Sequence, residues 1–175
     1  MSRPGFSLVE LLVVFVVVAL LLGISLPLLA RARTHQRATA CLSNLRQVAQ
    51  GFHLYADAND GYLPDEWSEY SWDGLVAPYL GSERVFICPA EDEGLSEGLG
   101  TTYDWRDIFQ VDPDVPAASL GGLKLANVKD TSLVLVFEIG QGWHDTGWIN
   151  AASVDTSARP WQDAEFDANL KVPVR

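Results

Sequence analysis

The sequence predicts an α+β fold in which one long N-terminal helix packs its second half on a small antiparallel β-sheet. Three observations support this prediction. Residues 11–29 form a 19-residue run without charge. Apolar residues then recur at helical spacing as far as residue 55, and short β-branched and aromatic segments between turn residues occupy the last third of the chain.

Composition limits what such a chain can do. Its 175 residues suffice for one domain of ordinary size with an appendage. A hydrophobic content of 48% and a charged content of 20% are typical of a folded chain rather than a disordered one. The net charge of −11 argues against nucleic acid as the main partner, because phosphate backbones require clustered Lys and Arg. We therefore predict no nucleic-acid partner.

The apolar segment near the N-terminus predicts a membrane-spanning helix. Of the 24 residues from 6 to 29, 19 are apolar, and a helix of ~20 residues crosses a ~30 Å hydrocarbon core. A cleaved secretory signal is the alternative, since Arg3 precedes the segment and Ala30 and Ala32 frame a cleavage-like site. The segment is longer than such signals, and Glu10 near its start is unsuited to one.

The helix is expected to continue beyond the apolar segment for about 50 residues in all, or ~75 Å at 1.5 Å per residue. Asn59, Asp60, Gly61 and Pro64 predict its end. A stripe with the spacing of an amphipathic helix follows the span. Its apolar members are Ala38, Cys41, Leu42, Leu45, Val48, Ala49, Phe52 and Tyr55.

The remainder of the chain predicts a globular α+β domain over residues 61–175. Residues 57–114 carry 15 acidic side chains against Arg84 and Arg106, so this stretch is expected to be acidic and rich in loops. Strands are predicted at 84–88, 132–138 and 147–152. A helix packed on an antiparallel sheet is the simplest way to bury them.

The N-terminal residues Gly5-Phe6-Ser7-Leu8-Val9-Glu10, with the apolar run after them, resemble the cleavage and methylation motif of type IV prepilins and type II secretion pseudopilins. The resemblance implies that a leader of residues 1–5 is removed between Gly5 and Phe6, and that Phe6 becomes N-methylated. It places Glu10 at the fifth mature position and Pro27 where the helix of that family is kinked.

The resemblance also implies a pilin-like fold and a structural role. The chain would be a filament subunit and not an enzyme. Its domains would be the leader, a transmembrane half of the helix at 6–30, an amphipathic half at 31–60 and the globular domain at 61–175. Expected partners are other pilin or pseudopilin subunits, a prepilin peptidase and an inner-membrane assembly platform. The chain would cross the inner membrane once, with the globular domain extracytoplasmic.

Glu10 is a candidate assembly residue on physical grounds as well. A carboxylate beside a charge-free span is costly and persists only with a partner. The nearest candidate cation is the amine that cleavage creates at Phe6. If that amine belongs to a neighbouring subunit, the pairing would neutralise both charges and set the axial register between helices. The alternative is a glutamate that reaches the headgroups by itself.

The two cysteines, Cys41 and Cys88, are too far apart for a Cys-x-x-Cys metal motif and allow at most one disulfide. Cys41 lies on the apolar stripe and Cys88 ends a predicted strand, so both are expected in the core. An oxidising compartment would favour a bridge between them. Two buried free thiols remain the alternative.

Other side chains provide only weak signals of a ligand. Glu91, Asp92 and Glu93 are weak Ca²⁺ candidates without diagnostic spacing, and we predict no cofactor. His144 with Asp145 or Asp155 could be read as a hydrolase site, but no catalytic motif surrounds them, and a structural histidine is favoured.

Six tryptophans, all after residue 66, leave a membrane-anchored polysaccharide-binding module as the second candidate function. Indole faces stack on sugar rings, which is the basis of this alternative.

Overall fold

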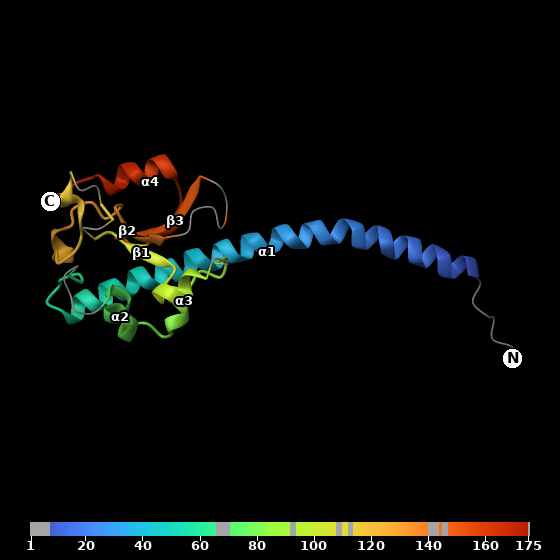
Figure 1. The fold of residues 1–175 in the computed structure, drawn as a ribbon, viewed down its shortest axis with the longest axis horizontal. Coiled ribbons are helices and arrows are strands. Elements are labelled where there is room, and N and C mark those ends of the chain that lie inside the picture. Colours follow the sequence, from blue (N-terminus) through green and yellow to red (C-terminus); the bar gives the residue numbers. More distant parts are fainter. Residues whose placement is uncertain are drawn as a thin grey trace. The chain divides into compact units, whose positions relative to one another are not determined.

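The computed structural model describes residues 8–65, 71–91, 94–107, 110–111, 114–139, 144 and 147–174. The chain divides into two compact units, Met1–Gln36 and Arg37–Arg175. One helix, α1 (Leu8–Ala58), contributes residues to both (Figure 1). The long N-terminal helix predicted from the sequence is confirmed.

In the first unit, α1 is predominantly apolar as far as Leu29, and its side chains are solvent-exposed wherever they are described. Its large hydrophobic side chains from Leu8 to Leu29 are all exposed where they are described. The helix is long and apolar enough to cross a membrane, with an 18-residue window of mean hydropathy 3.0, none of it buried. The hydroxyl of Ser25 donates to the Leu21 carbonyl at 2.7 Å, so this polar group is satisfied within the helix.

The end of α1 follows the turn chemistry that the sequence predicted. The Gly61 N–H donates to the Ala56 carbonyl at 2.8 Å, and the Asn59 side-chain amide donates to the Tyr55 carbonyl at 2.7 Å. Asp60 and Gly61 both have positive φ, at 54° and 84°. A helix commonly ends with such left-handed residues because they direct N–H groups to its last free carbonyls.

The second unit contains a four-stranded antiparallel sheet in the order β1-β2-β3-β4, so the predicted α+β class is confirmed. The strands are β1 (Tyr103–Trp105), β2 (Val134–Glu138), β3 (Trp148–Ser153) and β4 (Ala158–Gln162). The smaller helices are α2 (Trp72–Val76), η1 (Ala77–Tyr79), η2 (Glu83–Phe86), α3 (Leu95–Leu99), η3 (Pro116–Ala118), η4 (Leu125–Asn127) and α4 (Asp163–Leu170). The predictions at 132–138 and 147–152 correspond to β2 and β3.

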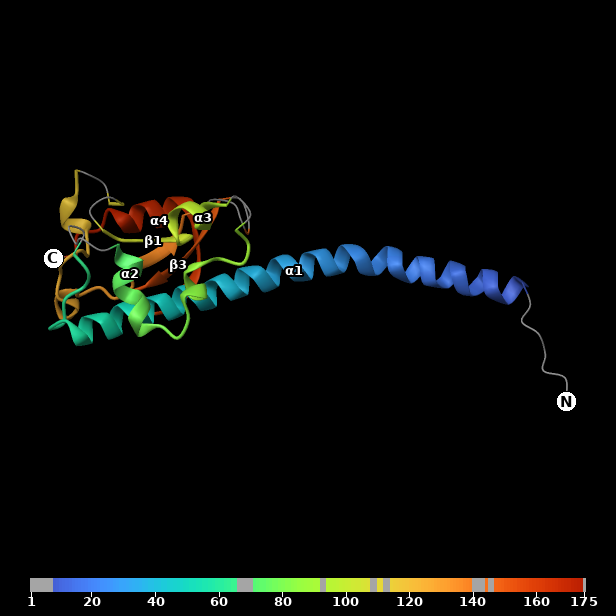
Figure 2. The ribbon, with the colours of Figure 1, turned by 60° about the horizontal axis from the view of Figure 1, so that its bottom comes forward.

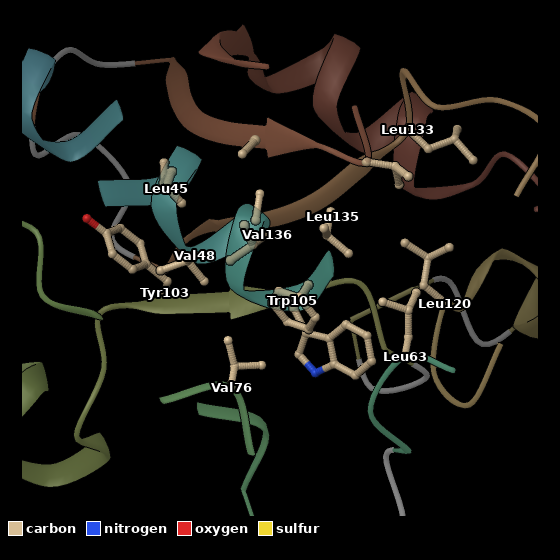
Figure 3. Packing of buried hydrophobic residues seen from close by; sticks show 14 of the residues in the cluster. Leu45, Val48, Leu63, Val76, Tyr103, Trp105, Leu120, Leu133, Leu135 and Val136 are labelled. Atoms are coloured by element: carbon tan, nitrogen blue, oxygen red, sulfur yellow. The ribbon is translucent and has the colours of Figure 1, made fainter. Parts of the chain in front are cut away.

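Within this unit the sheet lies between the second half of α1 and α4 (Figures 1 and 2). The main core joins the apolar stripe of α1 to one sheet face, and Leu45 and Val48 lie close to Val136 and Tyr103 (Figure 3). A smaller cluster packs Phe166 of α4 on the opposite face. The residues of α1 that the structure buries in the main core are Cys41, Leu45, Val48, Ala49 and Phe52.

Both faces of β2 are covered, and all five of its residues are buried. The pairing of β2 with β3 is irregular between Val134 and Val136, which places Leu135 and Val136 in the same core cluster. Such an irregularity inserts an extra residue and turns consecutive side chains toward one face. An unbroken apolar strand is thereby accommodated in an antiparallel sheet.

The strand predicted at 84–88 is wrong, because residues 83–86 form the 3₁₀ helix η2. The Arg84 N–H donates to the hydroxyl of Ser82 at 3.2 Å, which caps this helix. The Cys88 N–H donates to the hydroxyl of Thr102 at 2.6 Å. Local and side-chain acceptors satisfy these N–H groups, so the segment needs no neighbouring strand.

Candidate functional site

The processing and assembly residues predicted from the sequence are only partly described. Gly5 and Phe6 lie outside the described residues. Glu10 is in the first turn of α1, at an exposed position. Helix α1 is assigned without interruption through Pro27, and the predicted kink stays a prediction. The structure therefore leaves the roles of these four residues as predictions.

A second candidate site lies within the second unit, where four side chains from separate segments converge. Cys41 comes from the buried face of α1, and Cys88 follows η2. Glu138 ends β2, and His144 follows it in the connection to β3. Their ligand atoms all lie within 4.8 Å of one another. We call these four residues the Cys–Glu–His cluster.

The contacts inside the cluster are close. Oε2 of Glu138 lies 3.3 Å from Sγ of Cys41 and 3.4 Å from Nε2 of His144. The same Nε2 lies 3.3 Å from Sγ of Cys88. Each donor here has a single hydrogen, and each faces more than one acceptor. These three contacts link the four residues in series, and all four ligand atoms lie within 4.8 Å of one another, close enough to surround a single ion.

Neighbouring groups hold the cluster in place. The Asn150 backbone N–H donates to Oε1 of Glu138 at 2.8 Å, and its side-chain amide donates to Oε2 at 3.3 Å. Tyr103 on β1 is paired in the sheet with Glu138 on β2. Its hydroxyl donates to Sγ of Cys41 at 3.4 Å. Ordered donors around a group of ligands fix their orientation, as in the outer shell of metal sites.

The close contacts shift the acidity of the cluster. The hydrogen bond from Cys41 lowers the pKa of Cys88 to about 6, although burial opposes this. The same hydrogen bond, together with burial, raises the pKa of Cys41. Burial alone would lower the pKa of His144, but hydrogen bonds to Cys88 and Glu138 outweigh it and raise that pKa to about 9. Burial raises the pKa of Tyr103.

This arrangement is poorly suited to nucleophilic catalysis. In a catalytic triad the acid binds one ring nitrogen of histidine and the nucleophile binds the other. Here Glu138 and Cys88 both face Nε2, while Nδ1 is buried without a hydrogen-bond partner among the described residues. Both thiols are also closed to substrate, since Cys41 is 0% and Cys88 1% exposed.

The cluster can instead hold a metal ion. Two sulfurs, an imidazole nitrogen and a carboxylate oxygen form a donor set typical of Zn²⁺. The sequence analysis expected no metal and missed this set, because its members are separated by 47, 50 and 6 residues. The local signals were a glutamate that ends the apolar strand 134–138 and a cysteine on a buried stripe.

The disulfide predicted between Cys41 and Cys88 requires the two residues to lie together, and the structure does bring their thiols together. Both cysteines are free in the structure. The same proximity serves a disulfide and a metal site, and the two are mutually exclusive because they use the same sulfur atoms. The bridge stays a prediction.

The other predicted site residues either lie away from the Cys–Glu–His cluster or fall outside the residues that the structure describes. Asp155 is in the turn between β3 and β4, where its carboxylate accepts hydrogen bonds from the N–H and hydroxyl of Ser157. Asp145, Asp92 and Glu93 are outside the described residues. Glu91 accepts a hydrogen bond from Ser96 at 2.9 Å, a local contact between side chains.

One structural residue was also missed. The sequence analysis treated Arg106 as a counter-charge in an acidic stretch, whereas its side chain is fully buried. Its guanidinium donates to the Ala118 carbonyl at 2.7 Å, the Asn169 side chain at 3.0 Å and the Val172 carbonyl at 2.6 Å. Burial lowers its pKa to about 10. Arg106 thus ties the end of β1 to the segment after α4.

Comparison with known proteins identifies one feature. Residues 1–26 match the model of the prokaryotic N-terminal methylation motif, the signature of type IV prepilins and pseudopilins. No curated protein matches the chain, and no solved structure matches it either. The motif and the long apolar helix are consistent with membrane anchoring. The α+β architecture fits a pilin-like fold.

Proposed function

Taking the methylation motif at residues 1–26 as the premise, we propose that this chain is a structural subunit, a pseudopilin or minor pilin. It assembles through its N-terminal helix into a type IV pilus-like or type II secretion filament. The motif is the single observation that carries the proposal. Its partners are other pilin or pseudopilin subunits, the prepilin peptidase and the inner-membrane assembly platform.

The first unit supports this proposal through its surface. An exposed apolar helix is unfavourable in water, and it requires lipid or the helices of neighbouring subunits around it. Glu10 lies near the start of this apolar surface. A neighbouring subunit that offers its Phe6 amine to Glu10 would neutralise both charges where water is excluded. Glu10 therefore selects the axial position at which the next helix packs.

Two alternatives receive less support. A hydrolase would need an accessible nucleophile, and both thiols of the Cys–Glu–His cluster are buried. A polysaccharide-binding module would need exposed aromatic faces. Of the four tryptophans within the described ranges, Trp105 and Trp161 are buried, Trp72 is half-buried and Trp148 is 38% exposed. Within the described ranges, one partly exposed indole is a poor stacking surface for a sugar chain.

Leader removal provides the direct test of the premise. In cells that contain a prepilin peptidase, we expect the mature chain to begin with N-methyl-Phe6 because the Gly5–Phe6 junction is followed by Glu10. Intact-mass analysis of the membrane fraction measures this. Cells lacking the peptidase should accumulate the chain with residues 1–5 attached, and should lose any filament-associated fraction. A chain that retains residues 1–5 in peptidase-positive cells would contradict the proposal.

The proposal also requires a membrane topology opposite to the one that the distribution of positive charges predicts. Arg31, Arg33 and Arg37 follow the span and only Arg3 precedes it, so the positive-inside rule alone would leave the globular domain in the cytoplasm. Processing by a cytoplasmic-face peptidase requires the opposite. We expect externally added protease to digest residues 61–175 in spheroplasts. Complete protection there, with digestion only after lysis, would refute the extracytoplasmic assignment.

A further inference from the structure

We propose that Cys41, Cys88, Glu138 and His144 bind one Zn²⁺ ion in a closed, structural site. This inference does not depend on filament assembly, because all four ligands lie in the second unit. The ion would join α1, the segment after η2, the end of β2 and the β2–β3 connection. It would act as a cross-link within the fold, without a position open to substrate.

Three distances within the cluster match those expected between ligands of a tetrahedral ion. Zinc binds sulfur at about 2.3 Å and nitrogen or oxygen at about 2.0–2.2 Å. Tetrahedral geometry then separates a sulfur from a nitrogen or oxygen ligand by about 3.5 Å, and nitrogen from oxygen by about 3.4 Å. The sulfur of Cys41 lies 3.3 Å from Glu138, that of Cys88 lies 3.3 Å from His144, and His144 lies 3.4 Å from Glu138.

The chemistry of the donors selects the ion. Ca²⁺ and Mg²⁺ require oxygen ligands, of which the cluster offers one residue. Two thiolates with an imidazole and a carboxylate suit Zn²⁺, which has no geometric preference of its own and accepts mixed sulfur, nitrogen and oxygen sites. Binding requires both cysteines as thiolates and Nε2 of His144 without a hydrogen, and the protons that these groups carry in the metal-free chain pass to solvent. The dication neutralises two of the three negative charges that the two thiolates and Glu138 carry.

Burial is a second argument for a cation at this place. The side chain of Glu138 is 1% exposed and that of His144 is 9% exposed. A buried carboxylate needs a positive partner, and the amide groups of Asn150 supply only neutral hydrogen-bond donors. Without the ion this charge falls to the His144 imidazole at 3.4 Å, and Zn²⁺ would supply it when it binds both side chains. Hydrogen bonds from Asn150 and from Tyr103 restrain Glu138 and Cys41. A zinc site needs this second layer of contacts to keep its ligands oriented.

The test uses the full chain in detergent, expressed without a polyhistidine tag and stripped of metal under reducing conditions. Titration with Zn²⁺, measured by elemental analysis after gel filtration, should give one equivalent per chain. Titration with Co²⁺ should produce the d–d spectrum of a tetrahedral ion and a thiolate-to-cobalt charge-transfer band. The melting temperature should rise with zinc concentration and fall when a chelator removes it, since the ion binds only the folded chain.

Matched variants locate the site. C88S and E138Q should lose stoichiometric zinc and the dependence of the melting temperature on zinc. H35N and E165Q remove an imidazole and a carboxylate outside the cluster, and should retain both. N150L leaves the four ligands intact, and should weaken zinc binding by about 10–100-fold through loss of orientation. Zinc bound with wild-type affinity by C88S would overturn the proposal.

Measurements on the unmodified chain keep the proposal testable even where a variant fails to fold. The protein is isolated from its native compartment, denatured without reductant and alkylated, and its intact mass is measured. This measurement distinguishes a disulfide between Cys41 and Cys88 from two free thiols. A mass lower by two hydrogens with no alkylated thiol would establish the disulfide and overturn the zinc site. Two alkylated thiols with no zinc retained or bound on titration would overturn it too. Two alkylated thiols with one zinc per native chain would support it.

Discussion

Replacing Glu10 with glutamine is expected to reduce filament assembly by about 10²–10⁴-fold while leaving the chain folded and in the membrane. The variant keeps the size of the side chain and removes its charge. The Phe6 amine of the neighbouring subunit would then be left in an environment of low dielectric without a counter-charge. Removing one partner of a buried ion pair costs about 3–5 kcal/mol, and each ~1.4 kcal/mol is a factor of ten in an equilibrium constant.

The measurement is the amount of subunit in the sheared or high-molecular-weight filament fraction, relative to the total in membranes. S25A is a matched control, because it removes another polar group from the apolar segment and no charge. Ser25 donates only to the carbonyl of Leu21 one turn earlier among its described contacts, so its loss should leave assembly unchanged. Filaments at wild-type abundance in E10Q would exclude the proposed pairing.

Replacing Arg106 with methionine is expected to destabilise the second unit by about 3–5 kcal/mol. The methionine fills a similar volume but leaves the buried Ala118 carbonyl and the partly buried acceptors of Asn169 and Val172 without their donor. An unsatisfied buried acceptor costs about 1–3 kcal/mol. Against a total stability of ~5–15 kcal/mol, this loss is large. For a unit of this size the melting temperature should fall by roughly 10–20 °C.

Thermal unfolding of the full chain in detergent, followed by near-ultraviolet circular dichroism, measures this effect. R84M is the matched control, since Arg84 is exposed and its substitution should change stability by less than about 0.5 kcal/mol. R106K separates charge from geometry. Lysine retains the charge but cannot reach three acceptors with a planar fork, so it should recover only part of the loss. Equal melting temperatures for R106M and R84M would refute the structural role.

The elements that the sequence predicted well are those in which many neighbouring residues indicate the same secondary structure. Helix α1 could be predicted because 19 of 24 consecutive residues are apolar and the next stripe has helical spacing. Strand β2 could be predicted because five consecutive apolar residues, two of them β-branched, precede Glu138. In both cases many residues carry the same signal, so local exceptions such as Pro27 do not obscure it.

The elements that escaped prediction are short or carry contradictory residues. Strand β1 has only three residues and lies in an acidic stretch. Strand β4 contains Pro160, which a strand tolerates only at an edge, and β4 is an edge of this sheet. Helix α4 has a single buried residue, Phe166, in eight. Patterns of this length do not separate helix, strand and loop, and tertiary contacts decide among them.

The sequence by itself determined the anchoring segment of this protein, because that segment depends on properties of consecutive residues. The processing motif lies within residues 1–26, and a hydrophobic run of sufficient length forms a helix in lipid whatever follows it. The Cys–Glu–His cluster was decided only by the tertiary structure. Its four ligands come from positions 41, 88, 138 and 144, and no local spacing relates them. They meet because the buried stripe of α1 packs on the sheet where β2 ends, and this packing is a property of the folded unit.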